Sequence, residues 1–165
     1  MNNDPLSEAK SLWDSGQILE AGRIVFEQVA ITRRPIWAAK ALRFAADLTG
    51  IQDWIVSECI RISECPGDWH LGKSLFDRIR DKVLDLERMK NRTRSQDLSL
   101  DVWLLAELVA KLAYNATDPA DEFDDDTGWW VAVCLKYMAV DNNGSRVDDN
   151  AWAILTAECA SVPGE

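Results

Sequence analysis

The sequence predicts an all-α protein, and three observations support this prediction. Apolar residues recur every three to four positions in almost every segment, which is the spacing of one face of an α-helix. The alternation typical of half-buried strands is absent from the sequence. Glycine, proline and Asn/Asp turn signals divide the 165 residues into about eight segments of helical length. We therefore expect a bundle or a stack of αα-hairpins with about eight helices and no β-sheet.

The first four predicted helices are separated by residues that cap or break helices. These signals are Asp4 with Pro5, Gly16, the run Arg33-Arg34-Pro35, Gly50 and the run Cys65-Pro66-Gly67. Between them, the apolar positions that fit one buried face per helix are Leu6, Ala9 and Trp13; Ile18, Ala21, Val25 and Val29; Trp37, Ala41, Phe44, Ala45 and Leu48; and Ile51, Ile55, Cys59 and Ile62.

A longer amphipathic helix is predicted from about Asp68 to Lys90. Its inward positions are Leu71, Leu75, Ile79, Val83 and Leu86. Residues 88–94 are rich in cations, which are favourable at a helix C-terminus, and a basic docking patch is the alternative interpretation. Residues 91–97 lack apolar side chains. We expect residues 1–165 to form a single all-α domain, and 91–97 is the expected boundary if the chain is divided into two halves.

Two strongly apolar helices are predicted in the C-terminal half, at residues 102–114 and 129–138, with Ser99 as a candidate N-cap of the first. Their wide apolar surfaces predict that they pack together in the middle of that half. An Asn/Gly turn then leads to a short last helix. It is expected to start near Asp148 and to bury Trp152, Leu155 and Cys159.

The run from Ala9 to Phe26 resembles the second half of a tetratricopeptide repeat unit. The matching positions are Leu12, Gly16, Glu20, Ala21 and Phe26. The resemblance covers about 18 residues, and no second copy follows about 34 residues later. It implies an αα-hairpin at the N-terminus.

Charge is unevenly distributed along the chain. There are 28 acidic and 18 basic side chains, and the formal net charge is −10. Residues 1–80 are nearly neutral, whereas residues 96–165 carry 14 acidic and 3 basic side chains. Such an acidic surface repels phosphate backbones and anionic lipid headgroups, so we expect no nucleic-acid partner and no membrane partner. A basic protein partner fits this charge.

The carboxylates are concentrated in a short segment that ends at two adjacent tryptophans. The candidate partner-binding residues are Asp118, Asp121, Glu122, Asp124, Asp125, Asp126, Trp129 and Trp130. One or two of the carboxylates can cap the following helix, but the helix dipole acts only within its first turn, and the remaining like charges repel one another. A cationic partner would relieve that repulsion. A solvated loop and a bound hard cation are the alternatives, although the sequence lacks the EF-hand pattern.

Tryptophan is unusually frequent, with eight residues against four Phe and two Tyr. Neighbouring helix residues point about 100° apart, so Trp129 and Trp130 cannot face the same side. We expect both to be buried if their helix is central. Otherwise one of them adjoins the carboxylates, where an aromatic ring suits recognition of Arg or Lys.

No pattern in the sequence indicates catalysis, a cofactor or a zinc site. His70 is the only histidine, and the familiar nucleophile, phosphate-binding and metalloprotease motifs are absent from the sequence. The four cysteines show no metal-binding spacing and are expected to be small buried hydrophobes. The sequence shows neither a secretory signal pattern nor an apolar run of about 18 residues, so a cytoplasmic location is expected.

These observations predict a non-enzymatic, acidic protein-binding module that engages a basic partner through its C-terminal acidic segment. By analogy of composition alone, this is the character of an inhibitor or an immunity-type protein that blocks a basic toxin. The first alternative is a tetratricopeptide-like adaptor that binds a peptide in an N-terminal groove. The second is a Mg²⁺-dependent enzyme that uses the carboxylate cluster.

Overall fold

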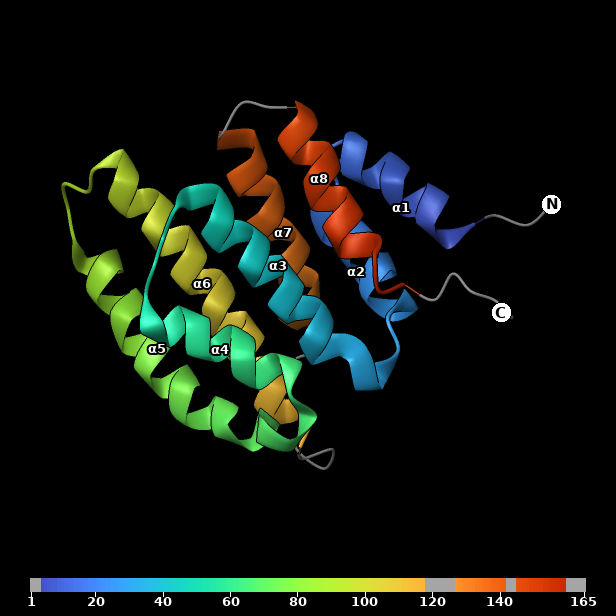
Figure 1. Cartoon of the computed structure of the whole chain (residues 1–165). Helices are drawn as coiled ribbons and strands as arrows, with labels where there is room; N and C mark the ends of the chain where they lie inside the picture. The colour runs from blue at the N-terminus through green and yellow to red at the C-terminus, as the bar shows by residue number, and fades with distance from the viewer. Residues whose placement is uncertain (1–3, 118–126, 142–144, 160–165) are drawn as a thin grey trace.

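The computed structural model describes residues 4–117, 127–141 and 145–159 (Figure 1). These residues form eight α-helices and no β-sheet, which confirms the predicted fold class. The helices are α1 (Pro5–Asp14), α2 (Ile18–Gln28), α3 (Arg34–Thr49), α4 (Trp54–Glu64), α5 (Gly72–Arg88), α6 (Arg94–Asn115), α7 (Thr127–Asp141) and α8 (Ser145–Thr156), with two short 3₁₀ helices, η1 (Ile31–Arg33) and η2 (Pro66–Leu71). None of the described helices is long and apolar enough to cross a bilayer.

Most helix boundaries in the N-terminal half lie where the cap and breaker residues predict them. The Asp4 carboxylate accepts a hydrogen bond from the backbone N–H of Leu6 at 3.1 Å and so caps α1. Gly16 and Gly50, both with positive φ, follow α1 and α3. Helix α4 begins later than predicted: Ile51 precedes it, and Asp53 caps it by accepting from the Ile55 N–H at 2.8 Å. Short polar side chains and glycines therefore set these ends.

The predicted helix over residues 68–90 is divided in the structure. Residues 66–71 form η2, and α5 begins at Gly72. The indole N–H of Trp69 donates to the carbonyl of Ser63 at 2.8 Å, which ties η2 back to α4. As a result Leu71, predicted to point inward, is 39% exposed.

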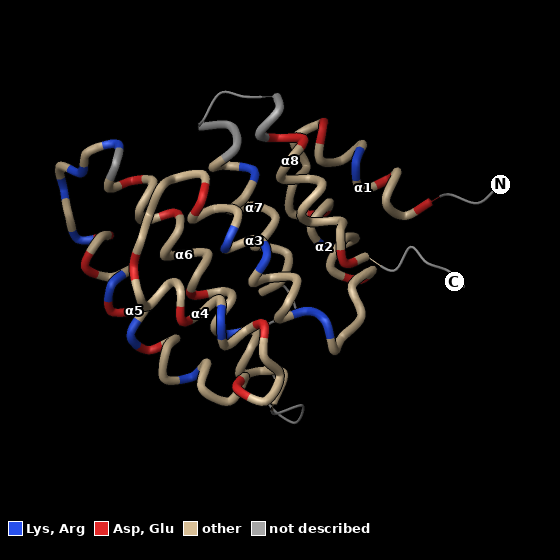
Figure 2. The backbone as a smooth tube through the Cα atoms, viewed as in Figure 1, with Lys and Arg blue, Asp and Glu red and all other residues tan. Residues whose placement is uncertain are grey.

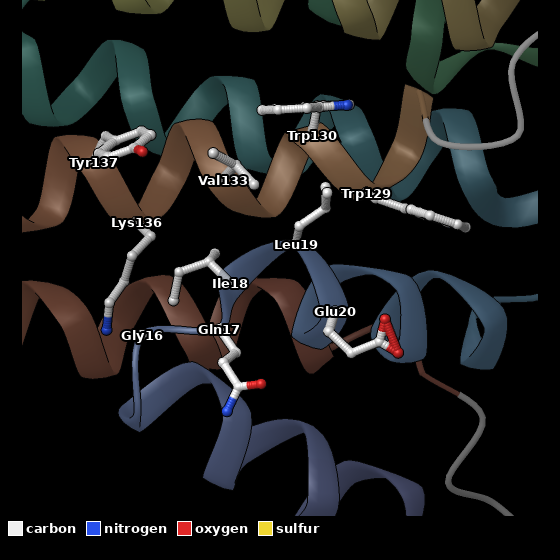
Figure 3. A pocket seen from close by; sticks show the side chains of 10 residues that line it. All are labelled: Gly16, Gln17, Ile18, Leu19, Glu20, Trp129, Trp130, Val133, Lys136 and Tyr137. Carbon is white, nitrogen blue, oxygen red and sulfur yellow. The ribbon is translucent and has the colours of Figure 1, made fainter.

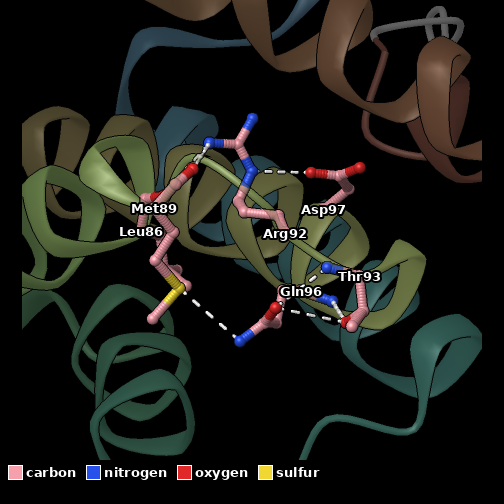
Figure 4. Close-up of polar contacts among 6 residues, drawn as sticks. All are labelled: Leu86, Met89, Arg92, Thr93, Gln96 and Asp97. Carbon is pink, nitrogen blue, oxygen red and sulfur yellow. Dashed lines mark hydrogen bonds and ion pairs between the residues drawn. The ribbon is translucent and has the colours of Figure 1, made fainter.

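Helix α6 begins earlier than predicted. Thr93, rather than Ser99, is its N-cap: the Thr93 hydroxyl accepts from the Gln96 N–H, and the Gln96 side chain accepts from the Thr93 N–H (Figure 4). Arg92 pairs with Asp97 at 2.6 Å and donates to the carbonyl of Leu86. Residues 94–97, expected to belong to a boundary segment, are thus the first turn of α6. The division of the chain into two halves remains a prediction.

Helices α3, α6 and α7 form the middle of the structure, with α4 and α5 on one side and α1, α2 and α8 on the other (Figure 1). The implied N-terminal αα-hairpin is present, since α1 packs against α2. Helix α7 packs against α6, as expected, and also against α2. Buried residues from all eight helices belong to one continuous hydrophobic cluster. The core therefore joins the near-neutral and the acidic parts of the sequence.

Candidate protein-binding site

The predicted site falls partly on described residues. Asp118, Asp121, Glu122, Asp124, Asp125 and Asp126 lie outside the described residues. Trp129 and Trp130 lie in the first turn of α7, which begins at Thr127 directly after the acidic segment in the sequence. Of the predicted site, the described residues therefore include the two tryptophans.

The two tryptophans do not share one environment. Trp129 is half-buried, while 43% of Trp130 is exposed, so the expectation that both are buried is wrong. Consecutive helix residues diverge by about 100°, and here Trp129 lies toward α2 while Trp130 projects from the outer side of α7 (Figure 3). An exposed tryptophan is thus present at the start of α7.

Trp130 lines a groove between the start of α2 and the outer side of α7. This α2–α7 groove has a volume of about 530 Å³. It is lined by Gly16, Gln17, Ile18, Leu19 and Glu20 on one side and by Trp129, Trp130, Val133, Lys136 and Tyr137 on the other. Leu19 is 38% exposed and Tyr137 is 64% exposed. Figure 3 shows Leu19 reaching toward Trp130, with Val133 between Trp130 and Tyr137 on the same side of α7. Large apolar side chains therefore face solvent from both sides of the groove.

Small residues bring α2 and α7 together beneath this groove. A Cβ atom added to Gly22 would lie 2.6 Å from the backbone oxygen of Trp129 and 2.9 Å from the Cβ of Ala132. A Cβ at Gly128 would lie 2.2 Å from the ring of Phe26. Any larger residue at Gly22 or Gly128 would clash with the facing helix, so only glycine fits at either position. The helix spacing that places Leu19 beside Trp130 thus depends on residues in the core.

The cations around the groove are already engaged by carboxylates. The Lys136 ammonium lies 4.5 Å from the ring centroid of buried Trp13 and pairs with Asp148 at 2.8 Å. Arg23 pairs with both Glu20 and Glu27, which places two carboxylates on one guanidinium. Since the cations are matched or outnumbered, the margin of the groove favours a positively charged ligand.

Sequence reasoning did not identify Leu19 and Tyr137 as part of the site. The available signal was the spacing of α7: Tyr137 follows Trp130 by seven residues, which places both on one helix face. Leu19 belongs to a different helix, more than 100 residues earlier in the chain. Only the packing of α2 against α7 brings it to this face.

A second concavity lies between the end of α3 and the start of α4. It is lined in part by Arg43, Asp53 and Trp54. Arg43 pairs with Glu64 at 2.8 Å, and Asp53 caps α4. The guanidinium of Arg78 lies 5.5 Å from the ring centroid of Trp54. Arg43, Asp53 and Trp54 therefore already have partners within the protein.

The basic region at the turn from α5 to α6 lies apart from the groove. Arg88, Lys90, Arg92 and Arg94 surround this turn, where Figure 2 shows blue residues at one end of the molecule. Arg92 contributes to the local structure through Asp97 and through the backbone carbonyls of Leu86 and Met89. A cation near the end of α5 is favourable to its dipole, as the sequence suggested.

Among the described residues, no group of three or more His, Cys, Asp or Glu side chains is arranged to hold a metal ion. His70 is exposed in η2. Cys59 and Cys159 are buried, and Cys134 is partly buried, but Cys65 is exposed, so the expectation of four buried cysteines is wrong for Cys65. Cys65 follows α4 and precedes Pro66, in the connection to η2 that faces solvent.

Burial raises the pKa of three of these thiols. It raises the pKa of Cys59 and of Cys134 to about 12, and that of Cys159 to about 11. A nucleophilic cysteine requires a lowered pKa. These three residues are therefore suited to packing rather than to nucleophilic chemistry.

The comparisons with known proteins identify no relative for this arrangement. No protein-family model, no curated protein and no solved structure matches the chain.

Proposed function

We propose that this protein is a non-enzymatic protein-binding module that engages a basic partner through the start of α7 and the acidic segment before it. One observation carries the proposal: Trp130 is 43% exposed and stands in an apolar groove, directly after a sequence segment with six carboxylates in nine residues, 118–126. Exposed tryptophans are among the residues that contribute most to protein interfaces.

The charge around the groove supports a basic rather than an acidic partner. Glu20 and Glu27 outnumber Arg23, and Asp148 neutralises Lys136. Residues 96–165 have a net charge of −11 and so hold all of the chain's negative imbalance. Like charges gathered on one surface destabilise the free protein, and a cationic partner removes that cost on binding. An inhibitor or immunity-type protein that covers the basic site of a toxin is the proposed role, in the cytoplasm.

The adaptor hypothesis has one observation in its favour. Residues 16–20, at the turn of the N-terminal hairpin that resembles part of a tetratricopeptide unit, line one side of the groove. In an adaptor the apolar groove alone would bind the peptide, and the acidic segment would contribute solubility. The two hypotheses therefore differ in what the carboxylates do.

Neutralising the carboxylates separates the two hypotheses. Asp121, Glu122, Asp124, Asp125 and Asp126 are replaced together by Asn or Gln, and affinity for a captured and purified partner is measured. We expect affinity to fall by at least about 30-fold, because charge pairs at an interface contribute several kcal/mol together. The matched control neutralises five exposed carboxylates elsewhere: Asp77, Asp81, Asp85, Glu87 and Asp97. Equal affinity of the first variant and wild type would contradict the proposal and favour the adaptor.

A further inference from the structure

The apolar side chains on the α7 side of the α2–α7 groove have the spacing of a helix-binding surface, with Trp130 and Tyr137 exposed and Val133 buried between them. Trp130, Val133 and Tyr137 follow one another at intervals of three and four residues on one side of α7 (Figure 3). At 1.5 Å per residue, Trp130 and Tyr137 are separated by about 10 Å along the helix axis. Two turns of a partner helix cover the same length, with anchors at positions i, i+3 or i+4, and i+7.

The groove also limits the backbone conformation of its ligand. No strand is present in the described part of the chain, so a bound peptide has no sheet edge to extend there. A peptide lying on Leu19, Trp130 and Tyr137 contacts mainly apolar surface, and only Gln17, Glu20 and Lys136 at its edges carry amide or charged groups that could bond to its backbone. A helix satisfies its own backbone hydrogen bonds, so it can bury an apolar face here at the lowest cost.

The charged side chains beside the groove indicate whether the polar face of the partner helix is positively or negatively charged. Both described cations beside the groove, Arg23 and Lys136, are held by carboxylates, and Glu20 and Glu27 together exceed the charge of Arg23. An acidic helix would add to this negative charge. Lysines or arginines flanking an apolar stripe would instead meet Glu20 and Glu27 on the α2 side of the groove.

We infer that the α2–α7 groove binds a cationic amphipathic helix of the partner protein, with the apolar face of that helix on Leu19, Trp130 and Tyr137. This inference rests on the proposed function and names the structural element through which the partner is recognised. Trp130 is the central anchor, since it faces Leu19 across the groove and adjoins Val133 on its own helix (Figure 3).

Three labelled peptides of about 18 residues test the inference, a length at which isolated helices begin to be stable. The first has leucines at helical spacing and lysines elsewhere. The second has glutamates in place of the lysines. The third has the composition of the first in an order without an apolar face. Fluorescence anisotropy with the full chain should show binding of the first peptide at least about 10-fold tighter than of either other peptide.

Variants of the protein locate the binding surface. Trp130→Ala and Tyr137→Ser, both at exposed positions, should each weaken binding of the first peptide by about 10-fold or more. Trp54→Ala is the matched control, because Trp54 is a 63% exposed tryptophan that lines the concavity between α3 and α4. It should leave the affinity unchanged.

The remaining outcomes distinguish failure of this inference from failure of the proposed function. One outcome is that the first and third peptides bind wild type with equal affinity, and that both bind weakly to the variant with five neutralised carboxylates. The helix inference is then wrong, and the proposed function stands. If neither cationic peptide binds, both are wrong. If sedimentation shows a dimer that Trp130→Ala dissociates, the groove is occupied by a second copy of this chain, and the inference is overturned.

Discussion

A Cβ atom on Gly22 would lie 2.6 Å from the backbone oxygen of Trp129, so helices α2 and α7 approach each other as closely as a glycine allows. The obstructing atom belongs to the backbone and cannot rotate away. This contact joins the N-terminal hairpin to the helix that carries the exposed Trp130, and it thereby sets the width of the α2–α7 groove.

Gly22→Ala is expected to destabilise the protein by about 1–3 kcal/mol, because the new methyl group forces α2 and α7 apart. Urea unfolding followed by circular dichroism measures this change in the free energy of unfolding. Gly67→Ala is the control, since a Cβ at Gly67 meets no atom within 4 Å. If the urea concentration at the unfolding midpoint were the same for Gly22→Ala and wild type, the close contact between α2 and α7 would not exist in solution.

Trp37→Phe should cost about 2–3 kcal/mol of stability. The buried Trp37 indole N–H donates to the carbonyl of Leu155 at 2.8 Å and ties α3 to α8, and the substitution leaves that carbonyl without this donor and a gap in the core. Trp54→Phe makes the same change at a 63% exposed position and should cost less than about 0.5 kcal/mol. Thermal or urea unfolding of both variants tests the difference, and equal losses would contradict it.

Glu158 should stabilise the protein only above acidic pH. Burial alone would raise the pKa of its carboxyl, but the hydrogen bonds and charges of Lys40 and Arg33 outweigh burial and hold the pKa below its ordinary value of 4.5. The carboxylate therefore contributes stability above about pH 4.5, and this contribution is lost as pH falls through the lowered pKa.

Glu158→Gln tests this pH dependence. At pH 7 the variant should be less stable than wild type by about 1 kcal/mol, the upper range for salt bridges whose cations face solvent, as Arg33 and Lys40 do. At a pH below the lowered pKa, the two proteins should have the same unfolding free energy. Glu8→Gln is a control, because Glu8 is exposed on α1, away from Lys40 and Arg33. A difference between Glu158→Gln and wild type that stays constant with pH would contradict the assignment.

One of the four cysteines should react rapidly with an aromatic disulfide reagent at pH 8. Cys65 is exposed, whereas burial raises the pKa of Cys59 and Cys134 to about 12 and that of Cys159 to about 11. The thiolate is the reactive form, so these three should react only when the protein opens. Cys65→Ser should remove the fast phase, and a fast phase that persists in this variant would contradict the assigned burial.

Association with the basic partner should be faster at low salt. Raising ionic strength from 0.01 to 0.15 M shortens the screening length from about 30 to about 8 Å, so we expect the association rate constant to fall by about tenfold. Stopped-flow mixing measures this rate constant. Neutralising the five carboxylates between residues 121 and 126 should flatten the dependence, while the matched control on α5 and α6 should retain it. A rate independent of salt in wild type would refute electrostatic steering.

Calorimetric titration with Mg²⁺ and Ca²⁺ addresses the enzyme alternative directly. The described residues contain no metal-binding group, and the carboxylates of 118–126 lie outside them. The proposed binding function predicts no heat beyond dilution with either ion. A stoichiometric heat that disappears in the variant with five neutralised carboxylates would instead support a cation site in the acidic segment.

Local sequence signals determined most of the helices. Asp4, Gly16, Gly50 and the Cys65-Pro66-Gly67 run act within a few residues of themselves, and the boundaries that they predict are present. The start of α6 was missed, because Ser99 and Thr93 are both good caps and only Thr93 has a glutamine three residues later that completes a capping box.

The exposure of particular side chains was decided only by tertiary packing. Helix α7 is apolar on nearly every side, so its sequence does not indicate which face is covered. The packing of α2, α6 and α8 around it leaves Trp130 and Tyr137 facing solvent. Leu19 joins them because Gly22 and Gly128 let α2 lie against α7.

The sequence by itself therefore determined the helical class, most of the helix ends and the concentration of negative charge near residue 120, since these depend on neighbouring residues and on composition. The tertiary structure decided that an apolar groove adjoins the start of α7 and that the cations beside it are paired with carboxylates. A groove is formed by residues from helices far apart in the chain, and their contacts depend on how the whole core packs.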